Sequence, residues 1–292
     1  MDQKFIIATD ATCDLPEEYI SAHKISVLPM SYTVDTTTYT GAPDSFLSGK
    51  EFYAALRAGS MAKTAQINPD QYRQHFEPYL KEGTSVLYIG FSSALSGSVQ
   101  SARIAAETLN ETYDAKLYIV DSLCASAGEG LLVDYACALR DSGATLEGIQ
   151  SWLEENKLHL CHNFTVDDLH FLHRGGRVSK TAAIFGSMLG VKPVMHVNDE
   201  GKLVPIAKVR GRRQSLVALV DNMAKAAPGY ANDRIFIGHG DCLEDAEFVA
   251  QLVRDRINPK EIIITYISPI IGAHSGPGTV AVFSMGDSRH TF

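Results

Sequence analysis

The first half of the chain alternates short apolar runs with longer amphipathic stretches. Three runs have the pattern of buried strands: residues 4–9, 85–91 and 116–120. Apolar side chains at helical spacing predict a helix that begins at Pro69, with Asn68 as its N-cap, and further helices over residues 97–109, 131–139 and 145–155. Because strand and helix alternate, these residues predict a layered α/β domain with a mostly parallel sheet.

The second half contains the same kinds of pattern in a different order. Strands are predicted over residues 159–166, 193–197, 202–209, 234–238, 261–267 and 279–283. Helices are predicted over residues 167–174, 181–189, 213–225 and 243–257. The Asn-Asp-Glu-Gly sequence at 198–201 tolerates turn dihedrals and predicts a hairpin. We therefore expect two domains, 1–158 and 159–292, the second of mixed α/β type.

Composition agrees with this organisation. The 292 residues are enough for two domains with separate cores, and an apolar fraction of 45% with a charged fraction of 21% is typical of globular proteins. We find no apolar run of about 18 residues, so no integral membrane segment is expected. The N-terminal residues lack the apolar core of a signal peptide. The five scattered cysteines argue against a disulfide framework or a zinc site, so we expect a cytoplasmic protein without a metal.

The formal net charge of -8 disfavours nonspecific nucleic-acid binding, which requires a cationic surface. Residues 174–213 depart from this balance because lysine and arginine recur along them. Such a basic segment is typical of a docking surface or an anion site. A solvated face explains the charge alone equally well.

Polar clusters follow several predicted strands, where open α/β sheets usually bind ligands. In residues 9–14, we expect Asp10 to hold a turn in place rather than to contact a ligand. Residues 63–66 form a donor-rich loop, and residues 92–98 place hydroxyls and free N–H groups at a helix N-terminus, which suits an anion as well as simple capping by Ser96. His274 lies among glycine, alanine and proline in a predicted loop at 271–279, where a ligand can approach closely.

A hydrolase triad is an alternative function for these clusters. Ser96 and His274 would supply the nucleophile and base, with Asp10 or Asp241 as the acid. However, Ala94 stands where the G-x-S-x-G elbow requires its first glycine. The sequence contains no P-loop, no G-x-G-x-x-G motif and no H-E-x-x-H motif. The clusters therefore favour a binding site over a catalytic one.

The chain resembles the DegV family, which includes the fatty-acid-binding subunits of bacterial fatty acid kinase. The resemblance runs nearly from end to end and is carried by motifs in the same order. These are TDATCDLP, KTAQINPDQY, GFSSALSGSVQSA, VDSLCASAGEGLL, LHRGGRVSKTAAIFGSMLGVKPV, KVRGRR and IGAHSGPGT. The resemblance implies two α/β domains with an acyl chain buried in a tunnel at or near their interface.

The resemblance also implies a set of site residues. Those that would hold the fatty-acid carboxylate are Thr64, Ser96 and His274, and those of the supporting loops are Ser93, Gly97 and Asp10. An anion at the mouth of an apolar tunnel needs such donors, because its desolvation is otherwise prohibitive. The acyl tunnel would use Ile184, Phe185, Met188 and Leu189, although this pattern is also typical of an ordinary core.

In the family, a separate kinase subunit transfers the γ-phosphate of ATP to the bound carboxylate, and the acyl phosphate passes on to an acyltransferase system of phospholipid metabolism. The resemblance places Arg177, Arg210 and Arg212 near the kinase or the phosphate, although Arg177 also suits a role in bracing the next helix. It implies a bound fatty acid as ligand, no cofactor and no complete active site in this chain. Related dihydroxyacetone-kinase-like folds suggest another alternative, a small carbonyl ligand attached at His274.

Overall fold

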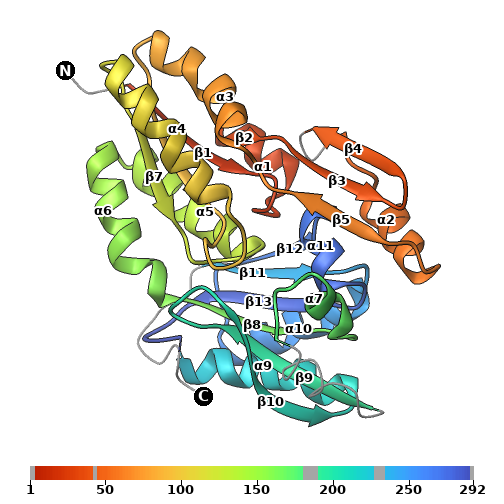
Figure 1. The fold of residues 1–292 in the computed structure, drawn as a ribbon. Coiled ribbons are helices and arrows are strands. Elements are labelled where there is room, and N and C mark those ends of the chain that lie inside the picture. Colours follow the sequence, from red (N-terminus) through yellow and green to blue (C-terminus); the bar gives the residue numbers. More distant parts are fainter. Residues whose placement is uncertain (1–3, 42–44, 180–189, 227–233, 290–292) are drawn as a thin grey trace.

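The computed structural model describes residues 4–41, 45–179, 190–226 and 234–289 (Figure 1). One sheet, in the N-terminal half, is formed by strands β1 (Phe5–Asp10), β2 (Ser26–Leu28), β6 (Ser85–Gly90) and β7 (Leu117–Asp121). Its order is β2-β1-β6-β7 and every pair is parallel. The sequence prediction of a mostly parallel N-terminal sheet is therefore confirmed.

Helices cover both faces of this sheet. One face is covered by α3 (Pro69–Lys81) and α4 (Ser98–Thr112), and the other by α5 (Ala127–Asp141) and α6 (Leu146–Asn156). Neighbouring strand residues enter different cores, since Ile7 lies in the core that contains α5 residues and Ala8 in the core of α3 and α4. Burial on both faces explains why these strands are continuous apolar runs.

The predicted helix start at Asn68 is also confirmed. The Asn68 side chain accepts a hydrogen bond from the backbone N–H of Gln71, and Pro69 is the first helical residue. A short helix, α1 (Glu17–Ala22), follows β1.

The sequence analysis did not predict the small antiparallel sheet, nor did it predict β2, α1 or the helix Gly49–Arg57. The small sheet contains β3 (Met30–Val34), β4 (Thr37–Gly41) and β5 (Ala62–Ala65) in the order β4-β3-β5. Helix α2 (Gly49–Arg57) lies between β4 and β5 in the chain. The prediction of a loop at residues 63–66 is wrong for Thr64, because residues 62–65 pair with β3 as an edge strand of mixed exposure.

A six-stranded mixed sheet occupies the C-terminal half. Its strands are β8 (Leu160–Thr165), β9 (Val191–Val197), β10 (Leu203–Arg210), β11 (Arg234–His239), β12 (Glu261–Tyr266) and β13 (Val280–Met285), in the order β10-β9-β8-β13-β11-β12. Only the pair β11–β12 is parallel. The hairpin between β9 and β10 turns at residues 198–201, where Gly201 N–H donates to the Asn198 carbonyl over 2.9 Å, as predicted.

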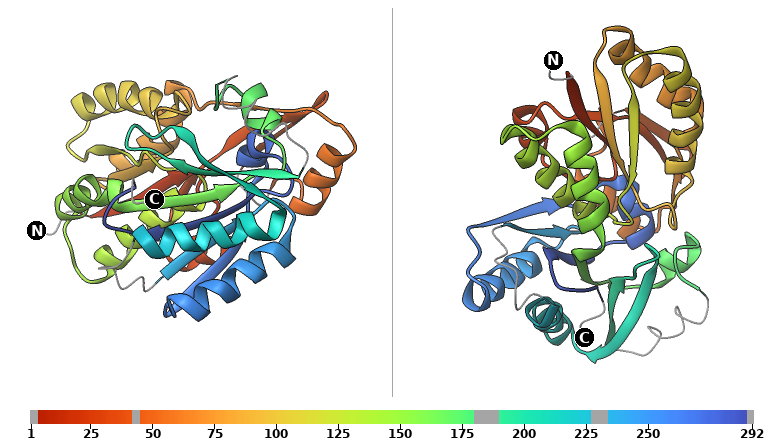
Figure 2. Two further views of the ribbon diagram at one scale, coloured as in Figure 1. Left: turned by 90° about the horizontal axis from the view of Figure 1, so that it is seen from below. Right: turned by 90° about the vertical axis from the view of Figure 1, so that its left-hand side faces the viewer.

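The two faces of this sheet have different neighbours. Helices α9 (Arg212–Ala226) and α10 (Leu243–Arg256) cover one face, while α5 of the N-terminal half contacts the other. The parallel sheet, α5 and the six-stranded sheet therefore contribute to one shared core, and the right-hand view of Figure 2 shows the two halves one above the other. The predicted domain boundary near residue 158 falls in the short helix η2 (Lys157–His159); the division into two domains itself stays a prediction.

Candidate functional site

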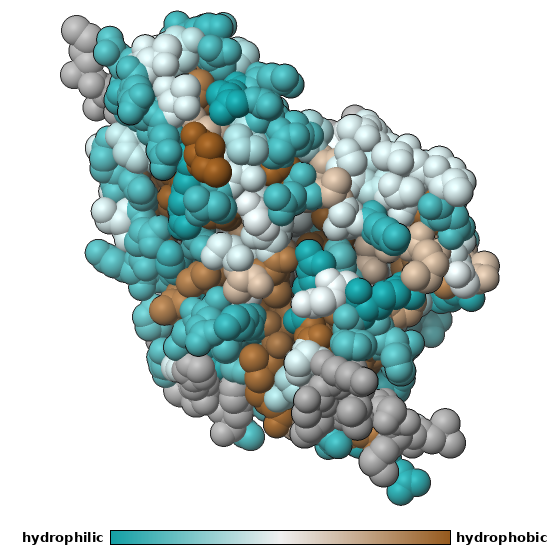
Figure 3. Space-filling model, in the orientation of Figure 1, coloured by the Kyte–Doolittle hydropathy of each residue, from teal (hydrophilic) through white to brown (hydrophobic). Residues whose placement is uncertain are grey.

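A cavity of about 540 Å³ lies between the two halves of the molecule. Strands β8, β10 and β13 give it apolar walls through Phe164, Leu203 and Phe283, and further apolar side chains come from Phe91 and Ile270. Apolar surface gathers in the hollow between the halves (Figure 3). Polar side chains line another part of the wall, and this combination of apolar walls with a few converging polar groups is typical of a ligand pocket.

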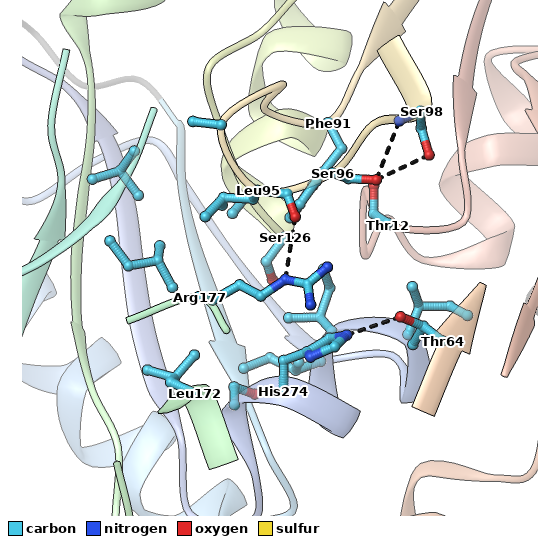
Figure 4. A pocket seen from close by; sticks show the side chains of 18 of the residues that line it. Thr12, Thr64, Phe91, Leu95, Ser96, Ser98, Ser126, Leu172, Arg177 and His274 are labelled. Carbon is cyan, nitrogen blue, oxygen red and sulfur yellow. Dashed lines mark hydrogen bonds between the residues drawn. The ribbon is translucent and has the colours of Figure 1, made fainter. Parts of the chain in front are cut away.

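Thr64 and His274 meet in this polar part of the wall (Figure 4). Oγ1 of Thr64, on β5, lies 2.9 Å from Nε2 of His274. His274 belongs to α11 (Pro269–Ser275), so the prediction of a loop over residues 271–279 is wrong for its first part. Pro269 suits the first position of a helix. Gly272 allows the close packing of α11, because a side chain there would overlap with the hydroxyl of Tyr53.

The His274 imidazole is neutral near physiological pH. Burial, together with the nearby guanidinium groups of Arg177 and Arg174, lowers its pKa from the ordinary value to about 4. Its Nδ1 is buried and has no hydrogen-bond partner among the described residues. Gly175 packs directly against this nitrogen, since a Cβ at Gly175 would overlap with Nδ1.

Ser96 lies on the opposite side of the polar wall, in the loop that leads from β6 into α4. Its Oγ accepts a hydrogen bond from the Ser98 N–H over 3.3 Å and lies 3.0 Å from the Ser98 Oγ. The helix N-cap is Gly97, so capping of α4 by Ser96 in the ordinary N-cap position is ruled out. Gly97 leaves room for Gln66, whose side-chain oxygen a Cβ would meet. Ser93 also lines the cavity, and its N–H donates to Asp121 over 3.1 Å.

Asp10 pins the turn after β1, as the sequence analysis favoured. Its Oδ1 accepts the Thr12 N–H over 3.0 Å, and its Oδ2 accepts the Tyr88 hydroxyl over 2.6 Å. Asp10 and Thr12 also line the cavity. In Figure 4, Thr12 lies beside Ser96.

The three arginines of the sequence analysis lie in different settings. Arg177 lines the cavity, and its guanidinium donates to the carbonyl oxygens of Leu95, over 3.2 Å, and of Gly175. It thereby connects the loop before α4 with the segment that follows α7 (His170–Arg174). The sequence analysis did not anticipate that this residue lies beside His274. Nothing in the short GGR motif predicted that this arginine would be partly buried.

Arg210 is exposed at the end of β10. Arg212 is bound internally: it pairs with Asp245 over 2.8 Å and with Asp167 over 3.4 Å, and it donates to the Gly278 carbonyl over 2.6 Å. The part of these arginines in docking stays a prediction. The predicted tunnel residues Ile184, Phe185, Met188 and Leu189 lie outside the described residues, so their part in an acyl tunnel stays a prediction.

The contacts of Ser96 and His274 give no support to a hydrolase triad. His274 Nε2 faces Thr64, and the Ser96 hydroxyl faces Ser98. The proposed acids are engaged elsewhere, Asp10 with Thr12 and Asp241 with Arg57.

Within the described ranges, no group of three or more histidine, cysteine or acidic side chains is arranged to hold a metal ion. In the same part of the chain, we find no helix with the length and apolar character needed to cross a membrane.

Comparisons with known proteins agree with this architecture. The family model described as an uncharacterised protein of the DegV family matches residues 4–287. A DegV domain-containing protein of Clostridium perfringens is 46% identical over 288 residues, which cover 98% of this chain and 99% of the relative. A DegV lipid-binding protein from Thermotoga maritima is similar in structure, with a TM-score of 0.84, 27% identity and coverage of 98% and 99% of the two chains.

A DegV family protein from Thermus thermophilus, described as binding fatty acid, also has a TM-score of 0.84, with 26% identity and coverage of 97% and 99%. The family match and the relative from Clostridium perfringens both extend over nearly the whole chain. This chain belongs to the DegV family.

Proposed function

We propose that this chain binds one long-chain fatty acid, with the acyl chain in the cavity between the two halves and the carboxylate at Thr64, Ser96 and His274. The observation that carries the proposal is the apolar cavity with the Thr64–His274 hydrogen bond in its polar wall. Fatty acid or lipid binding by similar DegV proteins of Thermus thermophilus and Thermotoga maritima supports it.

The contacts of His274 indicate how the donors would act. Nδ1 of the neutral imidazole is buried, has no hydrogen-bond partner among the described residues and lies near two guanidinium groups, which favour a lone pair over an N–H at this nitrogen. The proton then lies on Nε2 and is donated to Thr64 Oγ1. Thr64 is left with its own hydroxyl proton for the ligand carboxylate. In this proposal, His274 positions and polarises Thr64, and Thr64 contacts the carboxylate.

Ser96 and Arg177 complete the proposed carboxylate site. The Ser96 oxygen accepts the Ser98 N–H, so the Ser96 hydroxyl proton is available to a second carboxylate oxygen. Arg177, half-buried in the same wall, supplies positive charge. A carboxylate that leaves water for an apolar cavity requires this compensation, because an unpaired buried charge is strongly unfavourable.

We further propose that a separate ATP-dependent kinase phosphorylates the bound carboxylate in the cytoplasm. A carboxylate oxygen would attack the γ-phosphorus of ATP, ADP would leave, and the acyl phosphate would pass to an acyltransferase system. The exposed Arg210 and the cavity residue Arg177 have the charge to contact an acidic partner or the phosphate. Arg212 is less suited to this role, because two carboxylates already engage it.

Mass spectrometry of lipids extracted from the purified protein tests the binding proposal. We expect about one fatty acid per chain, or saturable binding of added fatty acid after lipid removal. If no acyl chain is recovered and none binds, the proposed function is wrong. Transfer of phosphate from ATP to the loaded protein by a purified kinase subunit tests the second step separately.

A further inference from the structure

Three buried carboxyl groups lie in or behind the polar wall of the cavity, and the proposed carboxylate site does not use them directly. We call Asp10, Asp14 and Glu129 the buried acid cluster; their exposed fractions are 0%, 6% and 0%. Asp10 lines the cavity itself, and the other two acids reach it through Thr12 and Ser126, which also line it. None of the ion pairs among the described residues involves any of the three acids.

Hydrogen bonding fixes a proton on Glu129. Thr12 Oγ1 lies within hydrogen-bond distance of both Asp10 Oδ1 and Glu129 Oε2, the latter at 2.8 Å, but a hydroxyl has only one proton to donate. One of the two acids must therefore donate to Thr12. Asp10 already accepts hydrogen bonds from the Thr12 N–H and the Tyr88 hydroxyl, which suit the ionised form. The Glu129 carboxyl accepts one other hydrogen bond, from the Thr9 hydroxyl over 2.7 Å. Burial raises the pKa of both acids, and it raises that of Glu129 well above its ordinary value with Asp10 adding to the rise, so we assign the proton to Glu129.

Asp14 connects the cluster to the helix that carries His274. Its Oδ1 accepts the Ser268 N–H over 2.9 Å at the start of α11, and its Oδ2 accepts the hydroxyl of Ser126. Its backbone carbonyl accepts the Thr265 hydroxyl over 2.8 Å. Asp14 thus joins the turn after β1, the segment before α5 and the N-terminus of α11.

The environment of Asp14 makes it the member of the cluster that titrates near neutral pH. Burial raises its pKa to about 7, and the hydrogen bonds from Ser126 and Ser268 limit the rise. The titratable groups that face it are all acidic: Asp10 in the turn after β1, Glu129 on α5, Cys13 beside it in the chain and Tyr53 on α2.

We propose that fatty-acid binding is coupled to the uptake of a proton by the buried acid cluster, and that Asp14 is the residue that takes it. This inference rests on the proposed function. A bound carboxylate adds negative charge near an acidic cluster without paired cations, and the repulsion disfavours ionised Asp14. Protonated Asp14 keeps its contacts, because its carbonyl oxygen accepts the Ser268 N–H and its hydroxyl donates to Ser126. The coupling therefore changes charge without rearranging α11.

Calorimetric titration with a long-chain saturated fatty acid in phosphate and in Tris at pH 7.5 tests the inference, because the difference between the two heats counts the protons exchanged. For wild type we expect net uptake of part of a proton. Asp14→Asn, which mimics the protonated side chain, should bind the acid without uptake. Glu129→Gln is the matched control: Glu129 is already protonated, so uptake should persist in this variant.

Binding of the acid with equal heats in both buffers, or the same uptake in Asp14→Asn, would overturn the inference alone. Absence of any fatty-acid binding would overturn the proposed function and the inference with it. If Asp14→Asn does not fold, the inference is tested by the pH dependence of wild-type fatty-acid affinity. This affinity is measured at concentrations where the fatty acid is monomeric. Affinity should fall by about threefold or more from pH 6 to pH 8.5, as repulsion from ionised Asp14 grows. A flat profile would contradict proton uptake.

Discussion

Thr64 and His274 are separated by 210 residues in the chain, yet Thr64 Oγ1 and His274 Nε2 lie 2.9 Å apart. The contact joins β5, the edge of the small antiparallel sheet, to α11, which follows the last parallel strand of the C-terminal sheet. Only the assembly of both halves brings the two side chains together. Fatty-acid affinity should therefore depend on residues that position this pair as well as on the pair itself.

Replacing Thr64 by valine removes the hydroxyl and nearly preserves the side-chain shape. We expect fatty-acid affinity to fall about 10- to 100-fold, since a hydrogen bond to a charged group contributes roughly 1.5–3 kcal/mol. Thr64→Ser keeps the hydroxyl and should retain most of the affinity. Isothermal titration of the two variants makes the comparison, and equal affinities would remove Thr64 from the carboxylate site.

The packing of Gly175 against His274 gives a second prediction. Gly175→Ala places a Cβ on the imidazole Nδ1, which should displace His274 from Thr64 and weaken fatty-acid binding about tenfold or more. Gly176→Ala is the control: Gly176 has a φ of 75° but no neighbouring atom within 4 Å of a Cβ. That variant should cost about 1 kcal/mol of stability and leave affinity unchanged. Similar affinities in the two variants would argue against a positioning role for His274.

The protonation of His274 can be observed directly. Nitrogen-15 NMR should show a neutral ring at pH 7 with the proton on Nε2, and an Nδ1-protonated or doubly protonated ring would contradict the proposed donor chain. The pKa also affects stability, because it falls from about 6.5 in the unfolded chain to about 4 in the folded one. Between these values only the unfolded chain binds the proton, so lowering the pH destabilises the fold.

The loss of stability caused by His274 should reach about 2 kcal/mol when the pH is lowered from 7 to 5. His274→Gln removes the titrating ring, so its unfolding free energy should fall less over this interval than that of wild type. Chemical denaturation at the two pH values measures the difference. Equal losses in both proteins would show that His274 is not buried as described.

A variant of Arg210 allows fatty-acid binding to be tested separately from phosphorylation of the bound acid by a kinase. Because Arg210 is exposed and does not line the cavity, Arg210→Ala should leave fatty-acid affinity unchanged but slow phosphorylation of the bound acid by a kinase subunit. Arg254→Ala, at an exposed position of α10 on the far face of the sheet, is a matched control and should change neither quantity. Normal phosphorylation of the Arg210 variant would exclude it from the docking surface.

Local patterns predicted the main sheets but not the small one. Buried strands such as β1 and β6 are continuous apolar runs, and Asn68 with Pro69 defines a helix start by local chemistry. Strands β3 to β5 are short and partly exposed, so they lack the continuous apolar run of a buried strand. β3 and β4 pair as a hairpin, and β5 joins β3 only after the intervening helix α2.

The candidate site, too, could be predicted in part from local sequence patterns. Thr64, Ser96 and His274 could be named as candidates from motifs, and the structure brings all three to one cavity. The burial of His274 Nδ1 and the position of Arg177 in the wall arise from packing between segments. No local pattern encodes such contacts, because they depend on how the two halves meet.

The central claim is that the cavity holds a fatty acid by its carboxylate. Titration of the lipid-free protein with a long-chain fatty acid, and with the methyl ester of the same acid, tests it most directly. We predict saturable 1:1 binding of the acid and affinity for the ester that is about tenfold or more weaker, because the ester cannot offer a charged oxygen to Thr64 and Ser96. No saturable binding of the acid, or equal affinity for acid and ester, would contradict the claim.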